Sequence, residues 1–325
     1  MNIAWLETRR GNNKGHRKAS PNTEVSAGLR YASAMCKLLK ADLITDASMI
    51  KYYEKTNYDI IIVGYSTVYQ EFKLEADFIK NQKKASIIHI TTEYGNSCPA
   101  SIFYAKKPFL QISNVSHIPK NQTGGAWKYR NSYYHCNLNL LFFNPTKKTV
   151  KKRDINSIYY GRYREDRANY LKILNNTPVV VSTSIKNKPK WVLSGVNDVK
   201  YIKKLDWTPF RETLRLYMYS IYFEDTYTHS NYNCPANRYY EALSVDTLPL
   251  IHISCANTFK EAGIIWNDNV VFETAGELRK LVSSRTLYDS CVKWMQDEKS
   301  RIEQEKMLFE KDIKDVIFNY MEQSR

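Results

Sequence analysis

The stretch Asp59-Ile-Ile-Ile-Val-Gly64 decides the fold class of this 325-residue chain. Its run of apolar residues is typical of a strand buried on both faces of a parallel sheet, and Gly64 ends it. A second run of this kind, Ser86-Ile-Ile-His-Ile90, follows one expected helix later. The alternation of strands and helices predicts a doubly wound α/β domain. The remaining patterns are strands at 1–6 and 43–45 and helices at 20–39 and 71–80.

A second domain of the same kind is expected after the polar, basic stretch at 145–153, which we interpret as a hinge. A chain of this length exceeds the size at which a single hydrophobic core usually stops growing. The sequence predicts domains at 1–146 and 150–304. In the second domain, strand patterns lie at 155–160, 179–181, 248–253 and 264–266, and helix patterns at 166–174, 213–223, 238–244 and 275–283.

The last forty residues read as one helix with an apolar face. Two placements are open, a surface helix on the second domain or a helix that returns to the first domain, which 305–325 would then complete. The apolar face comprises Leu308, Ile313, Val316, Ile317, Tyr320 and Met321.

The composition indicates a folded protein with an anionic partner. Forty-eight Lys and Arg against 33 Asp and Glu leave a formal charge of +15, and the excess gathers in a few loops. The alternative is a surface charged only for solubility. The six cysteines show no spacing typical of zinc or disulfides, and no segment resembles a membrane span or signal peptide. We expect a soluble, cytoplasmic monomer without a metal site or membrane partner.

Two basic segments are candidates for contact with a partner that bears many phosphates. One is the loop at 9–18, and the other is a stretch at 94–134 in which the periodic pattern is lost and aromatic residues alternate with basic ones. Aromatic and basic side chains suit base stacking and phosphate neutralisation, whereas a plain surface loop is the alternative. The residues that would make these contacts are Arg9, Arg10, Lys14, Arg17, Lys18, Lys106, Lys107, Trp127, Lys128 and Arg130.

A diphosphate site is predicted where the strand at 155–160 meets the following helix. Gly161 lets the backbone approach a ligand closely, and guanidinium groups match phosphate oxygens. Arginines placed in advance can stabilise charge that grows on a departing phosphate. The alternative is a solvated charge run in which Glu165 and Asp166 are the partners. The candidate residues are Gly161, Arg162, Arg164 and Arg167.

The helix at 238–244 carries a second candidate pair. Arg238 and Glu241 stand three residues apart and therefore share one face. The carboxylate could accept both hydroxyls of a ribose, while the arginine reaches the diphosphate. A simple intrahelical ion pair is the alternative.

These motifs resemble the T-even phage DNA glucosyltransferases. In the β-type enzyme of that family a strand ending in Tyr-Gly precedes two functional arginines, which Gly161, Arg164 and Arg167 match with one residue fewer between the arginines. Arg238-Tyr-Tyr-Glu241 matches its donor-binding helix, and Asp246 takes a position that is glycine in more distant relatives. The segment 262–289 is similar to the α-type enzyme instead.

The resemblance implies a GT-B-like fold, with two Rossmann-like domains facing across a cleft and a C-terminal helix crossing back to the first domain. The first domain would bind DNA, because the segments at 9–18 and 103–130 resemble in position the family's DNA-facing loops. The second domain would bind a UDP-sugar. The implied reaction moves a sugar from UDP-glucose or UDP-arabinose to a hydroxymethylated base of double-stranded DNA in a phage-infected bacterium. The resemblance implies Glu93, at the end of the strand at 86–90, as catalytic base and Asp225 near the sugar. No divalent metal is required for donor binding, and a stimulatory metal is left open.

Two other functions fit the sequence. A glycosyltransferase of this fold could act on a glycan or lipid, with the basic loops on an anionic surface, and a non-catalytic DNA-binding protein could use the same domains. The sugar, the modified base, any DNA sequence preference and the stereochemical course stay open, because diphosphate and ribose motifs do not read sugar hydroxyls.

Overall fold

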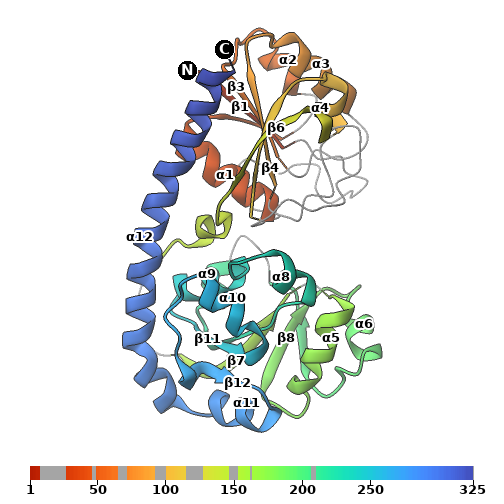
Figure 1. Cartoon of the computed structure of the whole chain (residues 1–325). Helices are drawn as coiled ribbons and strands as arrows, with labels where there is room; N and C mark the ends of the chain where they lie inside the picture. Colours follow the sequence, from red (N-terminus) through yellow and green to blue (C-terminus); the bar gives the residue numbers. More distant parts are fainter. Residues whose placement is uncertain are drawn as a thin grey trace. The chain divides into compact units, whose positions relative to one another are not determined.

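The computed structural model describes residues 1–7, 27–45, 49–64, 72–91, 100–114, 127–145, 153–161, 163–205 and 210–324. The chain divides into two compact units: unit 1 comprises Met1–Leu141 and Lys306–Arg325, and unit 2 comprises Phe142–Glu305. Within the described ranges, each unit is built around one six-stranded sheet whose paired strands are all parallel (Figure 1). The expected α/β class with two Rossmann-like domains is confirmed.

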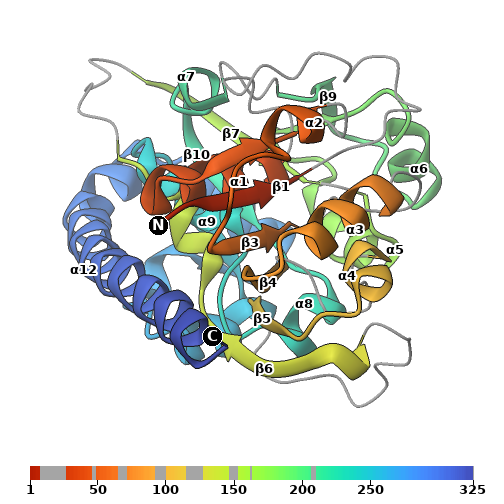
Figure 2. The same ribbon diagram turned by 90° about the horizontal axis from the view of Figure 1, so that it is seen from above.

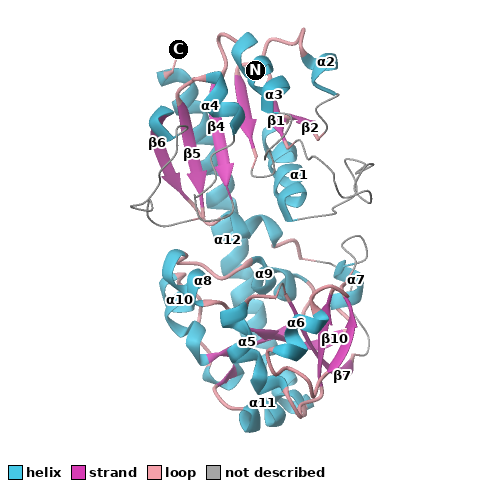
Figure 3. Ribbon diagram, turned by 90° about the vertical axis from the view of Figure 1, so that its right-hand side faces the viewer, coloured by secondary structure: helices cyan, strands magenta, loops and turns pink. Residues whose placement is uncertain are grey.

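The sheet of unit 1 has the strand order β2-β1-β3-β4-β5-β6, and Figure 3 shows β4, β5 and β6 side by side. Every residue of β1, β3 and β4 is buried, which is the pattern of central strands covered on both faces. Ile61 and Ile87 of these strands share one core with Phe78 and Ile102 of the helices α3 and α4. These two helices pack against each other (Figure 2).

The elements of unit 1 begin with β1 (Ile3–Leu6), α1 (Ala27–Leu39), β2 (Asp42–Ile44), α2 (Ile50–Tyr53) and β3 (Ile60–Val63). They continue with α3 (Phe72–Asn81), β4 (Ser86–Thr91), α4 (Ala100–Ala105), β5 (Phe109–Ser113) and β6 (Arg130–His135). The described part of the expected helix at 20–39 is therefore helical, and the strands expected at 1–6, 43–45, 59–63 and 86–90 are present with small shifts in their ends.

The stretch at 94–134 is more regular than we expected. It contains α4, β5 and β6, so the prediction of a long irregular segment is wrong for its described part. All five residues of β5 are buried, and Phe109 and Ile112 are fully inaccessible to solvent. The run is short and is interrupted by Gln111, so no apolar pattern marks it, and only its place between β4 and β6 explains its burial.

The sheet of unit 2 has the strand order β12-β11-β10-β7-β8-β9. Its elements begin with β7 (Asp154–Tyr160), α5 (Glu165–Leu171), β8 (Val179–Thr183), α6 (Lys188–Leu193), β9 (Lys200–Lys203), α7 (Phe210–Leu214) and β10 (Tyr217–Tyr222). They continue with α8 (Thr226–Asn231), α9 (Asn237–Ser244), β11 (Leu248–His252), α10 (Ala256–Glu261), β12 (Val271–Phe272) and α11 (Ala275–Val282), and α12 (Arg285–Gln323) ends the chain's regular structure.

Two secondary-structure predictions in unit 2 are wrong. The helix expected at 213–223 is instead the end of α7 followed by the central strand β10, because a run of aromatic residues with Met218 and Ile221 suits a position buried on both faces of the sheet. Residues 264–266, where we expected a strand, form none, and β12 is the edge strand of the sheet. The backbone N–H of Ile265 donates a hydrogen bond of 2.7 Å to the Glu298 carboxylate rather than to a carbonyl of a neighbouring strand.

The C-terminal helix α12 begins in unit 2, and its last part belongs to unit 1, so the predicted return of this helix to the first domain is confirmed. Its apolar face in unit 1 is built from Phe309, Ile313, Ile317 and Tyr320, at helix spacing. Leu308 was expected on this face but is 63% exposed. It precedes Phe309, the first residue of the buried row, and is therefore rotated by about 100° from it around the helix axis.

Asp246, at the position that is glycine in more distant relatives, adopts a backbone conformation that glycine favours. It has a φ of 58°, the left-handed conformation that aspartate tolerates better than most residues. Its backbone carbonyl accepts a hydrogen bond of 2.7 Å from the Tyr288 hydroxyl, and its carboxylate forms an ion pair with Lys299, so α12 holds this turn on both sides.

Candidate functional site

The strand order of unit 2 places a ligand site by topology alone. From β7 the chain winds outward to β8 and β9, and it then returns to the other side of β7 to form β10. Loops that leave two such neighbouring strands diverge, and ligands of open α/β sheets bind in the crevice beyond the carboxyl ends of these strands. Here those ends are Gly161, after β7, and Glu224 with Asp225, after β10.

Two buried arginines meet at this switch point. Arg167 of α5 is 4% exposed and Arg238 of α9 is 9% exposed. Glu224, which is 1% exposed, bridges them: its Oε2 lies 3.2 Å from Nη2 of Arg167, and its Oε1 lies 2.8 Å from Nη2 of Arg238. One carboxylate therefore fixes the positions of two guanidinium groups from different helices.

Asp225 holds a third arginine at the same place. Its Oδ2 lies 2.6 Å from Nη2 of Arg167 and 3.2 Å from Nε of Arg164, whose side chain is 46% exposed. Its Oδ1 accepts hydrogen bonds of 2.8 Å from the backbone N–H and the hydroxyl of Thr228, so Asp225 is the N-cap of α8. We call Arg164, Arg167 and Arg238 the arginine cluster.

The contacts of Asp225 explain its ionisation. Burial alone would raise the pKa of this carboxyl, but the Arg167 guanidinium, the bonds from Thr228 and the charge of Arg164 outweigh burial and bring the pKa below its usual value. A carboxylate that is buried, ion-paired and held ionised suits the positioning of arginines. Its predicted catalytic role near the sugar stays a prediction.

Because the pKa of Asp225 is lower in the folded protein than in the unfolded chain, its contribution to stability is present above the unfolded pKa of about 4 and is lost as the pH falls through the folded value. We expect the free energy of unfolding to decline below about pH 4, and Asp225→Asn to make this decline shallower. Urea denaturation across this pH range measures both. Parallel curves for the two proteins would contradict the assignment.

Gly161 leaves space that two polar groups need. A Cβ atom at this position would lie 2.7 Å from the Tyr159 hydroxyl and 3.2 Å from Nη1 of Arg238. Within the described structure, the Tyr159 hydroxyl and Nε of Arg238 are buried without a hydrogen-bond partner. Buried polar atoms are nearly always satisfied, so these two favour a polar ligand that binds beside Gly161.

The helix α9 enters this site through its first turn. Arg238 donates to the Phe223 carbonyl at 2.8 Å, and its guanidinium lies 5.5 Å from the centre of the Tyr222 ring. Its carboxylate partner is Glu224 rather than Glu241, so the alternative of a simple intrahelical pair does not hold for these two residues. Glu241 is buried, and its Oε1 accepts from the Asn237 amide at 3.1 Å.

The structure thus brings five predicted residues into one site, namely Gly161, Arg164, Arg167, Asp225 and Arg238. Glu241 lies one turn further along α9, and Arg162 lies outside the described residues. Sequence reasoning missed Glu224. Had 217–222 been recognised as a strand, a carboxylate directly after it at the switch point would have been a candidate.

Fewer of the site residues predicted in unit 1 lie within the described part of the chain. Glu93, Arg9, Arg10, Lys14, Arg17 and Lys18 lie outside the described residues, as does the side chain of Trp127, whose backbone begins a short 3₁₀ turn. The described ones, Lys106, Lys107, Lys128 and Arg130, precede or begin β5 and β6. They therefore lie at the amino-terminal edge of the sheet, opposite the carboxyl ends from which the loop at 9–18 and Glu93 follow.

A buried carboxylate also stands at the switch point of unit 1, between β1 and β3. Glu7 is 1% exposed, and its Oε2 accepts a hydrogen bond of 3.0 Å from the Trp5 indole. A Cβ atom on Gly64 would lie 1.7 Å from this oxygen. Gly64 is therefore required here for space, and it ends β3 for a reason that the sequence alone did not show.

Two properties of the described ranges bear on the expected partners. No group of three or more His, Cys, Asp or Glu side chains in them is arranged to hold a metal ion. No helix in them has the length and apolarity needed to cross a bilayer.

Neither a protein-family model nor a curated protein matches the sequence, but solved structures match the fold. A beta-glucosyltransferase described as a DNA modifying enzyme, solved with and without uridine diphosphoglucose, has a TM-score of 0.71 at 15% identity. The T4 phage beta-glucosyltransferase in complex with UDP-glucose has a TM-score of 0.68 at 14% identity. An alpha-glucosyltransferase in complex with UDP-glucose and DNA containing an abasic site has 0.64 at 13%. Each match covers 98% of this chain and 99% of the other.

This chain has the fold of the phage DNA glucosyltransferases. The likeness extends over both units and nearly the whole length of each chain, which confirms the GT-B-like fold that the motifs at 159–167 and 238–241 implied. Both the beta and the alpha enzymes share this glucosyltransferase fold with the chain. At identities of 13–15% the comparison establishes architecture, and the roles of individual residues depend on the site described above.

Proposed function

We propose that this protein transfers a sugar from a UDP-sugar to the hydroxymethyl group of a modified base in double-stranded DNA. The observation that carries the proposal is the arginine cluster, held by Glu224 and Asp225 at the switch point of a fold shared with UDP-glucose-dependent DNA glucosyltransferases. Unit 2 would bind the donor and unit 1 the DNA, in the cytoplasm of a phage-infected bacterium.

The charge of the site suits a leaving nucleoside diphosphate. Three guanidinium groups face two carboxylates, and the partly exposed Arg164 supplies the one net positive charge. Transfer of the sugar breaks its bond to the diphosphate, and negative charge grows on the phosphate oxygen that departs. Guanidinium groups that are already oriented stabilise this charge without reorganisation, and they do so best where water is excluded. Gly161 would let the diphosphate approach the backbone beside Arg238.

The acceptor side of the proposal depends on Glu93. A carboxylate after a buried strand can take the proton of the hydroxymethyl group as its oxygen attacks the anomeric carbon. A base inside a duplex must first be flipped out, which costs a few kcal/mol and requires extensive contacts with the DNA backbone. The formal charge of +15 is consistent with such contacts.

The direct test is to incubate the protein with hydroxymethylated and plain duplex DNA and a panel of UDP-sugars, followed by mass analysis of the nucleosides. A mass gain on the modified base alone is expected, and its size distinguishes a hexose from a pentose. Turnover only on glycan or lipid acceptors would instead support a glycosyltransferase of this fold that acts on such acceptors. DNA binding without any turnover would leave a non-catalytic protein and overturn the proposal.

Glu241→Ala is expected to weaken UDP-sugar binding roughly ten- to a hundredfold, because a hydrogen bond to a charged group contributes roughly 1.5–3 kcal/mol. Calorimetric titration with UDP measures it. Asn237→Ala is the matched control, since it removes the 3.1 Å bond to Glu241 and keeps the carboxylate. Equal losses in both variants would mean that Glu241 acts only within the helix.

Glu93→Gln is expected to lower kcat by roughly ten- to a hundredfold while donor affinity stays the same, because solvent can still accept the proton at a reduced rate. Single-turnover kinetics on hydroxymethylated DNA measure the chemical step apart from binding. Unchanged turnover would assign the base to another residue.

A further inference from the structure

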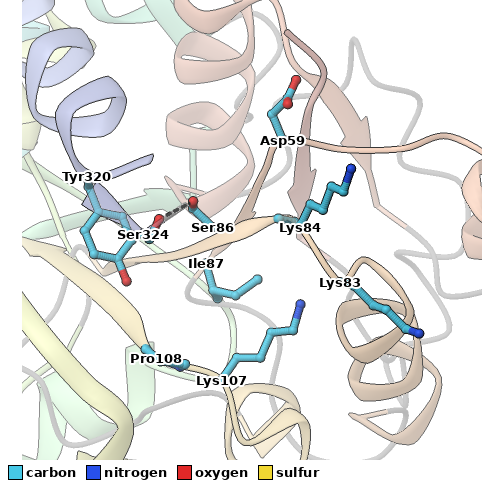
Figure 4. A pocket seen from close by; sticks show the side chains of 10 residues that line it. Asp59, Lys83, Lys84, Ser86, Ile87, Lys107, Pro108, Tyr320 and Ser324 are labelled. Atoms are coloured by element: carbon cyan, nitrogen blue, oxygen red, sulfur yellow. Dashed lines mark hydrogen bonds between the residues drawn. The ribbon is translucent and has the colours of Figure 1, made fainter. Parts of the chain in front are cut away.

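A polar cavity lies within unit 1, at the amino-terminal edge of its sheet. It has a volume of about 700 Å³, which falls in the range of small-molecule sites. Its wall is formed by the starts of β4 and β5 and by the last turn of α12 (Figure 4). The polar residues that line it are Asp59, Lys83, Lys84, Ser86, Lys107 and Ser324.

Positive side chains outnumber negative ones in the lining of this pocket. Three lysines line it against one carboxylate, and no described carboxylate forms an ion pair with any of the three. The Asp59 carboxylate accepts a hydrogen bond of 2.9 Å from the backbone N–H of Asn2. Lys107 is half-buried and donates to the Gln82 carbonyl at 2.5 Å, and burial lowers the pKa of its ammonium group. A partly desolvated cation without a counter-ion is stabilised by any anion that can reach it.

Hydroxyl groups complete the pocket. Ser86 is buried at the start of β4, and its Oγ lies 2.5 Å from Oγ of Ser324 (Figure 4). The ring of Tyr320 lines the same wall, and its hydroxyl donates to Asn131 of β6 at 3.0 Å. Ammonium and hydroxyl donors around one space match the oxygens of a phosphate group, for which lysine acts as a point charge.

We propose that this pocket is a phosphate-binding site, distinct from the switch points of both sheets. Its phosphate could come from the backbone of bound DNA or from a free phosphate or nucleotide. The neighbouring residues Lys106, Lys128 and Arg130 lie at the same edge of the sheet and extend the positive field along it. The proposal does not depend on sugar transfer.

The first experiment compares melting temperatures in phosphate and in chloride at equal ionic strength, with saturating UDP so that the site in unit 2 is occupied. The wild type is expected to gain stability in phosphate, and Lys84→Gln with Lys107→Gln is expected to lose this gain. Lys84→Gln alone, which leaves the bond from Lys107 to Gln82 intact, should weaken phosphate binding roughly tenfold. Lys73→Gln, on the exposed face of α3, is the control and should behave as wild type.

The second experiment identifies the source of the phosphate. Binding of plain duplex DNA is measured by fluorescence anisotropy over a range of salt concentrations. If the pocket holds a backbone phosphate, the salt slope of the double variant falls by about 0.9 for each DNA phosphate that the protein no longer neutralises. Loss of the stabilisation by phosphate with an unchanged slope assigns the pocket to a free phosphate or nucleotide. If the double variant matches the wild type in both experiments, the proposal is overturned, whether or not the protein transfers sugar.

Discussion

Glu224→Gln is expected to lower the free energy of unfolding by roughly 3–5 kcal/mol, the cost of removing one partner from a buried ion pair. Glu224 is 1% exposed and contacts Arg167 at 3.2 Å and Arg238 at 2.8 Å. Glutamine keeps the shape of the side chain, but it cannot accept from both guanidinium groups or neutralise them. Arg167 would then keep Asp225 as a carboxylate partner, whereas the buried Arg238 would lose the one carboxylate with which it forms an ion pair in the described structure.

Urea denaturation at neutral pH measures this loss, and Glu273→Gln is a matched control at an exposed position of the same unit. If Glu224 holds the arginines for a diphosphate, then UDP should recover part of the lost stability in the variant, because its phosphates would replace the missing charge. A loss below about 1 kcal/mol would show that the arginines are solvated rather than held by this carboxylate.

Arg164→Ala is expected to reduce kcat by roughly a hundred- to a thousandfold, the range found when one preorganised donor to a developing charge is removed. Of the arginine cluster, only Arg164 has a largely accessible side chain, at 46%, and it lies 3.2 Å from Asp225. Its removal should therefore leave the fold intact and expose its contribution to chemistry. KM for the UDP-sugar should change less than kcat, because the charge on the departing phosphate is greatest in the transition state.

Arg279→Ala is the matched control, an exposed arginine in the last turn of α11. It removes the same charge from unit 2 and should not alter turnover. If both variants lose activity equally, the effect of Arg164 is one of overall charge on DNA binding and not of leaving-group stabilisation. Repeating the assay at higher salt separates these cases, since a screened long-range effect weakens and a local contact persists.

Much of the site at the switch point of unit 2 could be predicted because its signals are local. Gly161 and Arg164 follow a strand within four residues, and Arg238 and Glu241 share one helix turn. In contrast, the prediction of a helix at β10 is wrong, since its six aromatic, apolar and polar residues carry no clear period. That error hid Glu224, because a carboxylate after a helix has no topological meaning, whereas after a central strand it faces the switch point.

The class of fold was readable from the amino-acid sequence alone. Strands buried on both faces of a parallel sheet must be apolar throughout, and helices that cover a sheet must carry an apolar stripe, so both leave a readable local pattern. Only the tertiary structure decided which groups meet. Glu224 lies 57 residues from Arg167, and Ser86 lies 238 residues from Ser324. Such contacts depend on the order of strands in the sheet and on the path of α12. Neither can be inferred from the local spacing of apolar residues.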